Sequence, residues 1–60
     1  MEPNMNRQQA LTQDKNFYAD EENGDWYVFG DNSGFAYSQH QSYEKAEEAV
    51  VKMRFARKEF

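Results

Sequence analysis

The sequence contains no cysteine, one proline, one histidine and three glycines among its 60 residues. Without cysteine, neither a disulfide bond nor thiolate-bound zinc can stabilise the fold. A single histidine, His40, excludes a histidine-rich metal site. The glycines stand apart from one another, so the chain has no glycine-rich phosphate-binding loop. We therefore expect no catalytic residues, no metal site and no cofactor, and a protein that is not an enzyme.

Aliphatic residues are also scarce: Leu11 is the only leucine, isoleucine is absent, and valine occurs only at Val28, Val50 and Val51. A domain of this length buries only about 60% of the surface that its unfolded chain exposes. Aromatic rings, which bury about 150–250 Å² each, must therefore supply much of the core. The same small size predicts that no pocket of several hundred cubic ångströms forms.

All ten aromatic residues lie after residue 16, which predicts a flexible arm over residues 1–15 and a single small α+β domain over residues 16–60. The arm is rich in asparagine, glutamine and charge. The alternative is a short helix over residues 7–12 that docks through Leu11. Because the chain begins with Met1, we expect a complete small reading frame, with Met5 as a possible second start.

Two clusters of turn-forming residues divide the middle of the chain into strands. A short apolar segment, residues 17–19, leads into an acidic loop that ends at Asn23 and Gly24, a strong hairpin signal. Residues 25–30 and 35–40 are rich in aromatic and β-branched residues, and the turn formers of residues 31–34 separate them. We therefore expect two or three antiparallel strands.

The register of the second hairpin decides which rings are buried, because a slip of one residue exchanges the two faces of a strand. Pairing Gly30 with Phe35 places His40 across from Asp25. In this register the buried face carries Trp26, Val28, Phe35 and Tyr37. The opposite face carries Tyr27, Phe29, Ala36 and Ser38. A three-residue turn ending at Gly34 would instead group Tyr27 and Phe29 with Phe35 and Tyr37.

From Ser42 onward the apolar period becomes helical. Ser42 is a good N-cap, and an amphipathic helix is expected over residues 43–58. Its core stripe consists of Tyr43, Ala46, Ala49, Val50, Met53, Ala56 and Phe60. The predicted fold class is α+β, with a β-hairpin or three-stranded antiparallel sheet packed on one C-terminal helix (β-β-α or β-β-β-α). Val51 and Phe55 form a second apolar patch, which we interpret either as ordinary exposed residues or as an interface.

The formal net charge of −4 argues against direct binding of nucleic acid or of anionic membranes. Residues 1–42 carry seven acidic and two basic side chains, whereas residues 43–60 carry four acidic and five basic side chains. The candidate partner-binding residues are an acidic rim and three aromatic anchors: Asp20, Glu21, Glu22, Asp25 and Asp31, with Tyr18, Tyr27 and Phe29. A calcium-binding loop is the less favoured interpretation of these acidic residues, because their spacing does not match an EF-hand.

Two binding hypotheses follow from this rim. A stacking platform for single-stranded nucleic acid would need a positive groove, and here carboxylates surround the rings. The favoured hypothesis is a non-enzymatic module that docks onto the basic surface of another protein, as an inhibitor of a nucleic-acid-handling protein. The alternative is a homodimerising regulatory or accessory protein that uses Val51 and Phe55. No apolar run is long enough for a membrane span, and a cytoplasmic location is expected.

The predicted order of strands and helix is similar to that of many small β-β-α modules, in which a helix that opens with serine and carries an alanine-rich face covers a hairpin. The relevant segments are residues 26–29, 34–37 and 42–49. A short, acidic, cysteine-free single domain also resembles the anti-defence proteins of phages and mobile elements, including anti-CRISPRs and anti-restriction DNA mimics. This resemblance implies inhibition by binding and assigns no residue a role.

Overall fold

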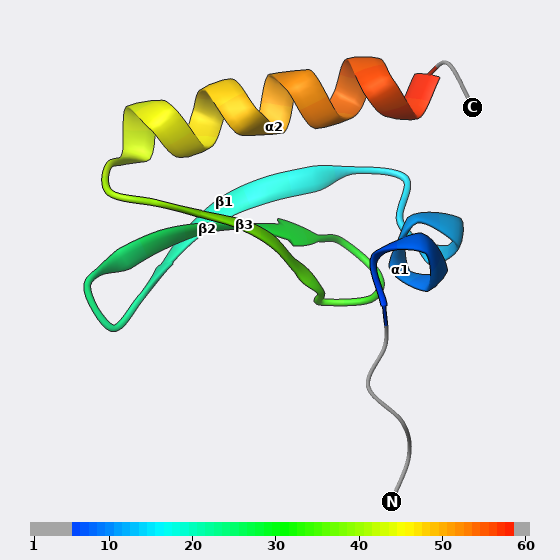
Figure 1. The fold of residues 1–60 in the computed structure, drawn as a ribbon, viewed down its shortest axis with the longest axis horizontal. Helices are drawn as coiled ribbons and strands as arrows, with labels where there is room; N and C mark the ends of the chain where they lie inside the picture. Colours follow the sequence, from blue (N-terminus) through cyan, green and yellow to red (C-terminus); the bar gives the residue numbers. More distant parts are fainter. Residues whose placement is uncertain (1–5, 59–60) are drawn as a thin grey trace, which may run out of the picture.

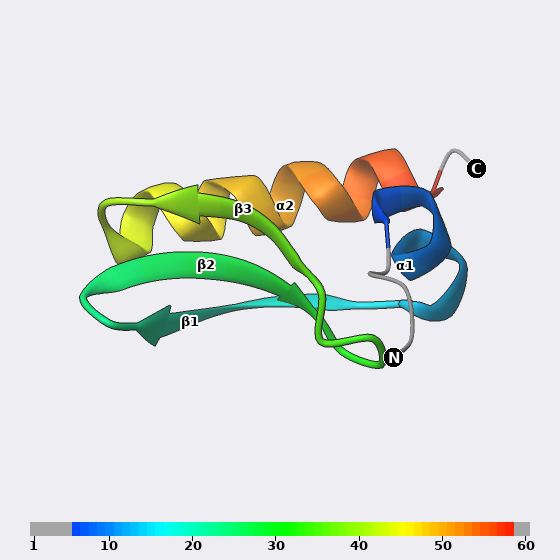
Figure 2. The ribbon, with the colours of Figure 1, turned by 60° about the horizontal axis from the view of Figure 1, so that its bottom comes forward.

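The computed structural model of the chain describes residues 6–58. In chain order the elements are α1 (Arg7–Gln13), β1 (Phe17–Glu22), β2 (Asp25–Gly30), β3 (Ala36–His40) and α2 (Tyr43–Lys58). The three strands form one antiparallel sheet in the order β1-β2-β3. Helix α2 covers one face of this sheet and contacts all three strands, while α1 lies at one end (Figures 1 and 2). The β-β-β-α form of the predicted α+β fold is confirmed.

The first hairpin turns within two residues. Asn23 and Gly24 both have positive φ angles, 55° and 89°, which suits the twist of a two-residue hairpin. Strand pairing therefore continues to Glu22, which lies opposite Asp25. The prediction that residues 20–22 form a loop was wrong, because the turn needs only the two residues that follow them.

The second hairpin has the predicted register near its turn and a different one beyond it. The Gly30 N–H donates to the Phe35 carbonyl at 3.1 Å, as expected for this pair. The register then shifts by one residue, so that Tyr37 is an extra residue on β3 and Val28 lies opposite Ser38. As a result His40 pairs with Trp26 and not with the expected Asp25.

The core is small and mixed. Its buried apolar residues come from all three strands and both helices: Ala10, Phe17, Val28, Tyr37, Ala46 and Val50. The Tyr37 ring meets Phe17 and Phe35 edge-on, with ring centroids 5.2 and 4.9 Å apart. The predicted core faces are confirmed for Val28 and Tyr37, whereas Trp26 and Phe35 are half-buried and pack against the core.

Helix α2 has the predicted bounds. The Ser42 hydroxyl accepts a hydrogen bond from the Lys45 N–H at 3.3 Å, so the predicted N-cap is confirmed. In the middle of the predicted stripe Ala46 and Val50 are buried and Ala49 and Met53 are partly buried, whereas at its ends Tyr43 is 51% exposed and Ala56 is also exposed. Phe60, the last residue assigned to the stripe, lies outside the described residues.

Helix α1 occupies the segment that we expected to be a flexible arm, close to the alternative helix over residues 7–12. The Asn6 side chain accepts from the Gln9 N–H at 2.8 Å, and the Gln9 side chain accepts from the Asn6 N–H at 3.1 Å. This reciprocal capping box stabilises a helix of only seven residues. Ala10 is fully buried, whereas Leu11, the expected docking residue, is partly buried against the core. Residues 1–5 of the expected arm lie outside the described residues.

Candidate functional site

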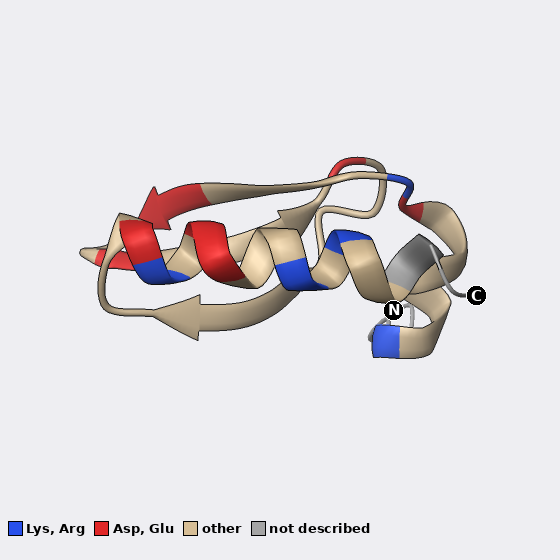
Figure 3. Ribbon diagram, turned by 90° about the horizontal axis from the view of Figure 1, so that it is seen from above, with Lys and Arg blue, Asp and Glu red and all other residues tan. Residues whose placement is uncertain are grey.

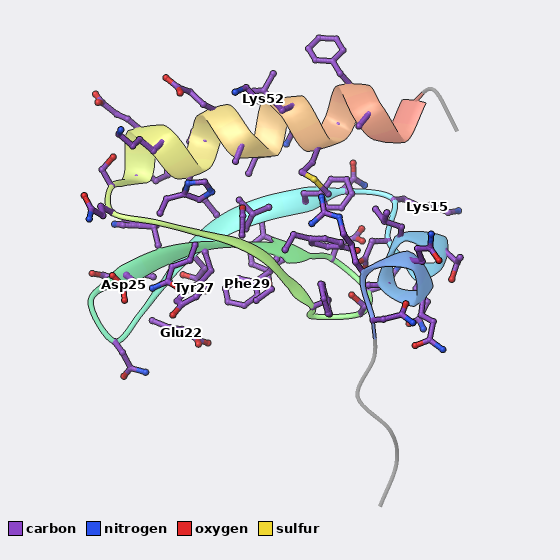
Figure 4. The ribbon with its side chains drawn as sticks, viewed as in Figure 1. Lys15, Glu22, Asp25, Tyr27, Phe29 and Lys52 are labelled. Atoms are coloured by element: carbon purple, nitrogen blue, oxygen red, sulfur yellow. The ribbon has the colours of Figure 1, made fainter. Side chains whose placement is uncertain are left out.

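The three predicted aromatic anchors lie together on the face of the sheet that α2 leaves open. Tyr27 and Phe29 point away from α2 (Figure 4), and Tyr18 lies directly opposite Phe29 across the β1-β2 pair. The ring centroids of Tyr18 and Phe29 are 5.8 Å apart, as are those of Tyr27 and Phe29. The half-buried Phe29 ring is therefore the centre of one contiguous aromatic surface.

Carboxylates continue this surface toward the β1-β2 turn. Alternation along β1 places Asp20 and Glu22 on the same face as Tyr18, and their cross-strand partners are Tyr27 and Asp25. The Gln39 side chain donates to the Asp25 carboxylate at 3.0 Å, which holds that group in place. We use the term open face for these residues together: Tyr18, Asp20, Glu22, Asp25, Tyr27 and Phe29.

The structure does not bring the whole predicted acidic rim together. Glu21 pairs with Trp26 and therefore projects from the α2 side of the sheet. Asp31 follows the far end of β2, where its carboxylate accepts a hydrogen bond from the Lys15 N–H at 3.2 Å. Of the five predicted acids, only three share a face with the aromatic anchors.

The charges of the protein are separated along its length. Figure 3 shows acidic residues gathered near the β1-β2 turn and the first turns of α2, whereas most basic residues lie farther along α2 and at α1. The acids of the open face are therefore at the negative end of the molecule. This arrangement favours a cationic partner at that end.

A buried carboxylate that the sequence did not reveal holds the opposite end together. Asp14 is fully buried and accepts hydrogen bonds from the backbone of Asn32 and Ser33, the Ser33 hydroxyl and the Tyr37 hydroxyl, at 2.6–2.8 Å. Burial by itself raises the pKa of Asp14, but these four hydrogen bonds outweigh it and lower the pKa below its ordinary value. The only sequence signal nearby is the Asn6-Gln9 capping box, which marks the helix that ends at this acid.

A groove between β3 and α2 contradicts the expectation that the chain is too small to form one. Its volume is about 500 Å³. The lining side chains come from both elements: Ser38, His40, Lys45, Glu48, Ala49, Lys52, Met53 and Ala56. Because of the extra residue in β3, Ser38 lies on the α2 side and not on the open face where it was expected. Its hydroxyl lies 2.8 Å from Nε2 of His40.

The predicted dimer patch lies on the outer side of α2. Val51 is 44% exposed and Phe55 is 64% exposed. They are one helical turn apart, so their side chains form a single apolar strip. Both are available for a contact with another molecule.

No protein-family model matches the chain, and the searches of curated proteins and of solved structures also find no match. Within residues 6–58, neither helix combines the length and the apolar character that crossing a membrane requires.

Proposed function

We propose that the protein is a binding module that uses the open face to dock onto a basic surface of another protein. The observation that carries this proposal is the contiguous Tyr18-Phe29-Tyr27 surface, bordered on the same face by carboxylates. Aromatic rings that are already ordered make good anchors, because little side-chain entropy is lost when a partner covers them. The adjacent carboxylates select a cationic partner and speed its approach.

The chemistry of this face suits arginine and lysine side chains in particular. A guanidinium or ammonium group can lie over an aromatic ring and at the same time pair with a nearby carboxylate. Cross-strand neighbours such as Asp20 and Tyr27 offer both partners side by side. Phosphate groups would meet repulsion here, so nucleic acid is the disfavoured ligand.

We propose that this binding inhibits the partner protein. A basic protein surface that accepts the open face is also suited to nucleic acid phosphates, so binding of this module would compete with nucleic acid. The protein would then act by occupying the phosphate-binding surface of a nucleic-acid-handling protein. Its net charge of −4 supports this direction of competition.

The experiment measures binding of a fluorescent peptide in which arginine alternates with serine, as a function of salt. We expect Glu22→Lys to weaken binding by about tenfold and to reduce the salt dependence. Displacement of single-stranded DNA from the same peptide by the unmodified protein tests the inhibitory role. If the protein binds the peptide but does not displace the DNA from it, the protein is a binding module but not an inhibitor of this kind.

Glu21→Lys is the matched control for Glu22→Lys. The two variants change the net charge equally and lie next to each other on β1, but their side chains project from opposite faces of the sheet. Binding through the open face predicts a large effect of Glu22→Lys and a small effect of Glu21→Lys. Equal effects would show that only the overall charge matters and would refute the proposed face.

The second candidate function is a homodimerising regulatory or accessory protein, favoured by the exposure of Val51 and Phe55. The double variant Val51→Glu, Phe55→Glu should remain folded, because neither side chain belongs to the core. Sedimentation of both proteins separates the two functions. A dimer that becomes a monomer in the variant supports this second function, whereas an unmodified protein that is already monomeric excludes it.

A further inference from the structure

The groove between β3 and α2 has the chemistry of a second binding site, separate from the open face. Ala49, Met53 and Ala56 give it an apolar lining on the helix side. The lining residues of α2 run from position 45 to position 56, which corresponds to about 16 Å along a helix axis. An extended peptide of about five residues has the same length.

The strand that borders the groove is an edge strand with backbone groups directed outward. No strand of residues 6–58 pairs with the outer side of β3. The Gly30-Phe35 hydrogen bond shows that alternate residues of β2, including Trp26, direct their backbone toward β3. The partner of Trp26 is His40, so the backbone N–H and C=O of the preceding residue, Gln39, face away from the sheet.

A side chain of this protein already uses the outer edge of β3. The guanidinium of Arg7 donates to the Tyr37 carbonyl at 3.3 Å and contacts the sulfur of Met53 at 3.4 Å. Arg7 therefore lies where the groove meets the free edge, and its guanidinium carbon is 5.4 Å from the centre of the Tyr37 ring. This contact shows that a hydrogen-bond donor outside the sheet reaches the edge of β3.

The charge of the groove is opposite to that of the open face. Lys45 and Lys52 line it with His40, against one carboxylate, Glu48. Lys52 extends from the outer side of α2 (Figure 4), so it borders the groove at its rim and not on its floor. Arg7 adds a further positive charge at the end that contains Met53. In a protein of net charge −4, this is a locally cationic site.

We propose that the groove binds a short extended peptide segment of a partner protein, which adds a strand to β3 and carries acidic and apolar side chains on the side facing α2. The outward backbone of Gln39 supplies main-chain hydrogen bonds. Ala49, Met53 and Ala56 receive an apolar side chain, and Lys45 and Lys52 pair with a carboxylate. Recognition through a sheet edge beside side-chain pockets is an established mode of peptide binding.

The test titrates the full-length protein with a capped, fluorescent heptapeptide of threonine, valine, threonine, glutamate, threonine, valine and threonine. Its order is the same in both directions, so the result does not depend on strand orientation. We expect binding at peptide concentrations below about 1 mM, the weak end of specific association. Replacing the glutamate of the peptide by lysine should weaken binding about tenfold. Absence of binding to the glutamate peptide would overturn the proposal.

Variants of the protein test separately the contribution of the lysine side chains and that of the β3 backbone edge. Lys45→Glu with Lys52→Glu should weaken binding about tenfold or more, whereas Arg54→Glu should have little effect. Arg54 is two positions beyond Lys52, about 200° around the helix, and does not line the groove. Equal sensitivity to Arg54→Glu and to a single Lys52→Glu would refute the assigned groove.

Gln39→Pro tests the edge contact, because it removes the outward N–H, and proline is tolerated on edge strands. Gln39→Ala is its control, since it removes the side-chain contact with Asp25 but keeps the N–H. If Gln39→Pro does not fold, two N-methylated forms of the peptide provide the test, one methylated on the odd-numbered residues and one on the even-numbered residues. One of these two peptides should lose binding, because its methyl groups block the N–H groups that face β3. Unchanged binding by both N-methylated peptides would overturn strand addition. Conversion of a dimer to a monomer by Gln39→Pro would assign the edge to a second copy of this chain.

Discussion

The Tyr37 hydroxyl donates a hydrogen bond to the Asp14 carboxylate at 2.6 Å, between residues 23 positions apart in the sequence. The same carboxylate binds the backbone N–H groups of Asn32 and Ser33 in the β2-β3 turn. One buried acid thus joins the end of α1, the turn and β3. A small core gains from such a contact because its apolar area alone is limited.

Asp14→Asn should lower the free energy of unfolding by about 2–4 kcal/mol, because it places a side-chain amide against donors that need an acceptor. Urea unfolding followed by Trp26 fluorescence measures this loss, with far-UV circular dichroism to detect a variant that does not fold. Asp31→Asn is the control, since this exposed acid accepts one hydrogen bond at 3.2 Å. It should cost about 0.5 kcal/mol or less. Similar losses in the two variants would contradict the central role of Asp14.

Stability should fall at acidic pH through Asp14. Its folded-state pKa is lower than its ordinary value of 3.8, because four hydrogen bonds to the carboxylate outweigh the effect of burial. The stabilisation is therefore present above pH 3.8 and is lost as the pH falls below that value toward the folded pKa. Urea midpoints measured from pH 6 down to about pH 2 should decline less steeply in Asp14→Asn than in the unmodified protein. Identical slopes would show that other acids cause the decline.

Stability should also fall at alkaline pH through Tyr37. Burial and the hydrogen bond to the negative Asp14 raise the pKa of its phenol above the ordinary value of 10.0. The unfolded chain loses this proton first, so the contribution is complete below pH 10 and is lost as the pH rises beyond it. Tyr37→Phe should therefore be less stable at neutral pH and less sensitive to alkali. Urea midpoints between about pH 8 and pH 11 provide the comparison.

Gly30→Ala should destabilise the fold because a methyl group at this position would overlap the Asp14 carboxylate. We expect a loss of about 1–3 kcal/mol or more from this overpacking. In an Asp14→Ala background the loss should shrink, which a double-mutant cycle measures as coupling. Gly34→Ala is the control: its surroundings are open, and only its φ angle of 73° opposes a side chain, so its loss should not depend on Asp14. Additive losses of Gly30→Ala and Asp14→Ala would contradict the predicted overlap.

Asn6→Ala should weaken helix α1 by about 1 kcal/mol, because it removes the acceptor of the Gln9 N–H. Amide hydrogen exchange should become faster within residues 7–13 and change less in β2. Gln8→Ala is the control, since Gln8 is exposed and alanine favours helices. An unchanged exchange rate in residues 7–13 of Asn6→Ala would show that contacts of Ala10, and not the cap, hold this helix.

Much of the fold could be predicted because its signals are local. Asn23 and Gly24 mark the position of the first hairpin turn, although not the end of β1, and the N-cap at Ser42 lies directly before the helix it begins. The shared face of Tyr18, Tyr27 and Phe29 also follows from alternation along two adjacent strands. The binding roles that we assign to these rings remain predictions.

Other features depend on contacts that no local pattern contains. The extra residue at Tyr37 shifts His40 to Trp26 and moves Ser38 to the α2 side, where it lines a groove. The sequence did not show that Glu21 and Glu22 project from opposite faces of the sheet, because this depends on β1 continuing to Glu22, which the length of the turn decides. The acidic rim therefore contained two residues, Glu21 and Asp31, that the folded chain places elsewhere.

The sequence by itself determined β2, β3, the helix α2 and the acidic, aromatic character of the sheet, because propensity, turn geometry and alternation act over a few residues. Only the tertiary structure decided that Asp14 is buried, that α1 is ordered against Tyr37, and that a cationic groove opens opposite the acidic open face. These outcomes require residues 18–30 positions apart to meet. The free energy of such contacts depends on packing and burial that exist only after the chain has folded.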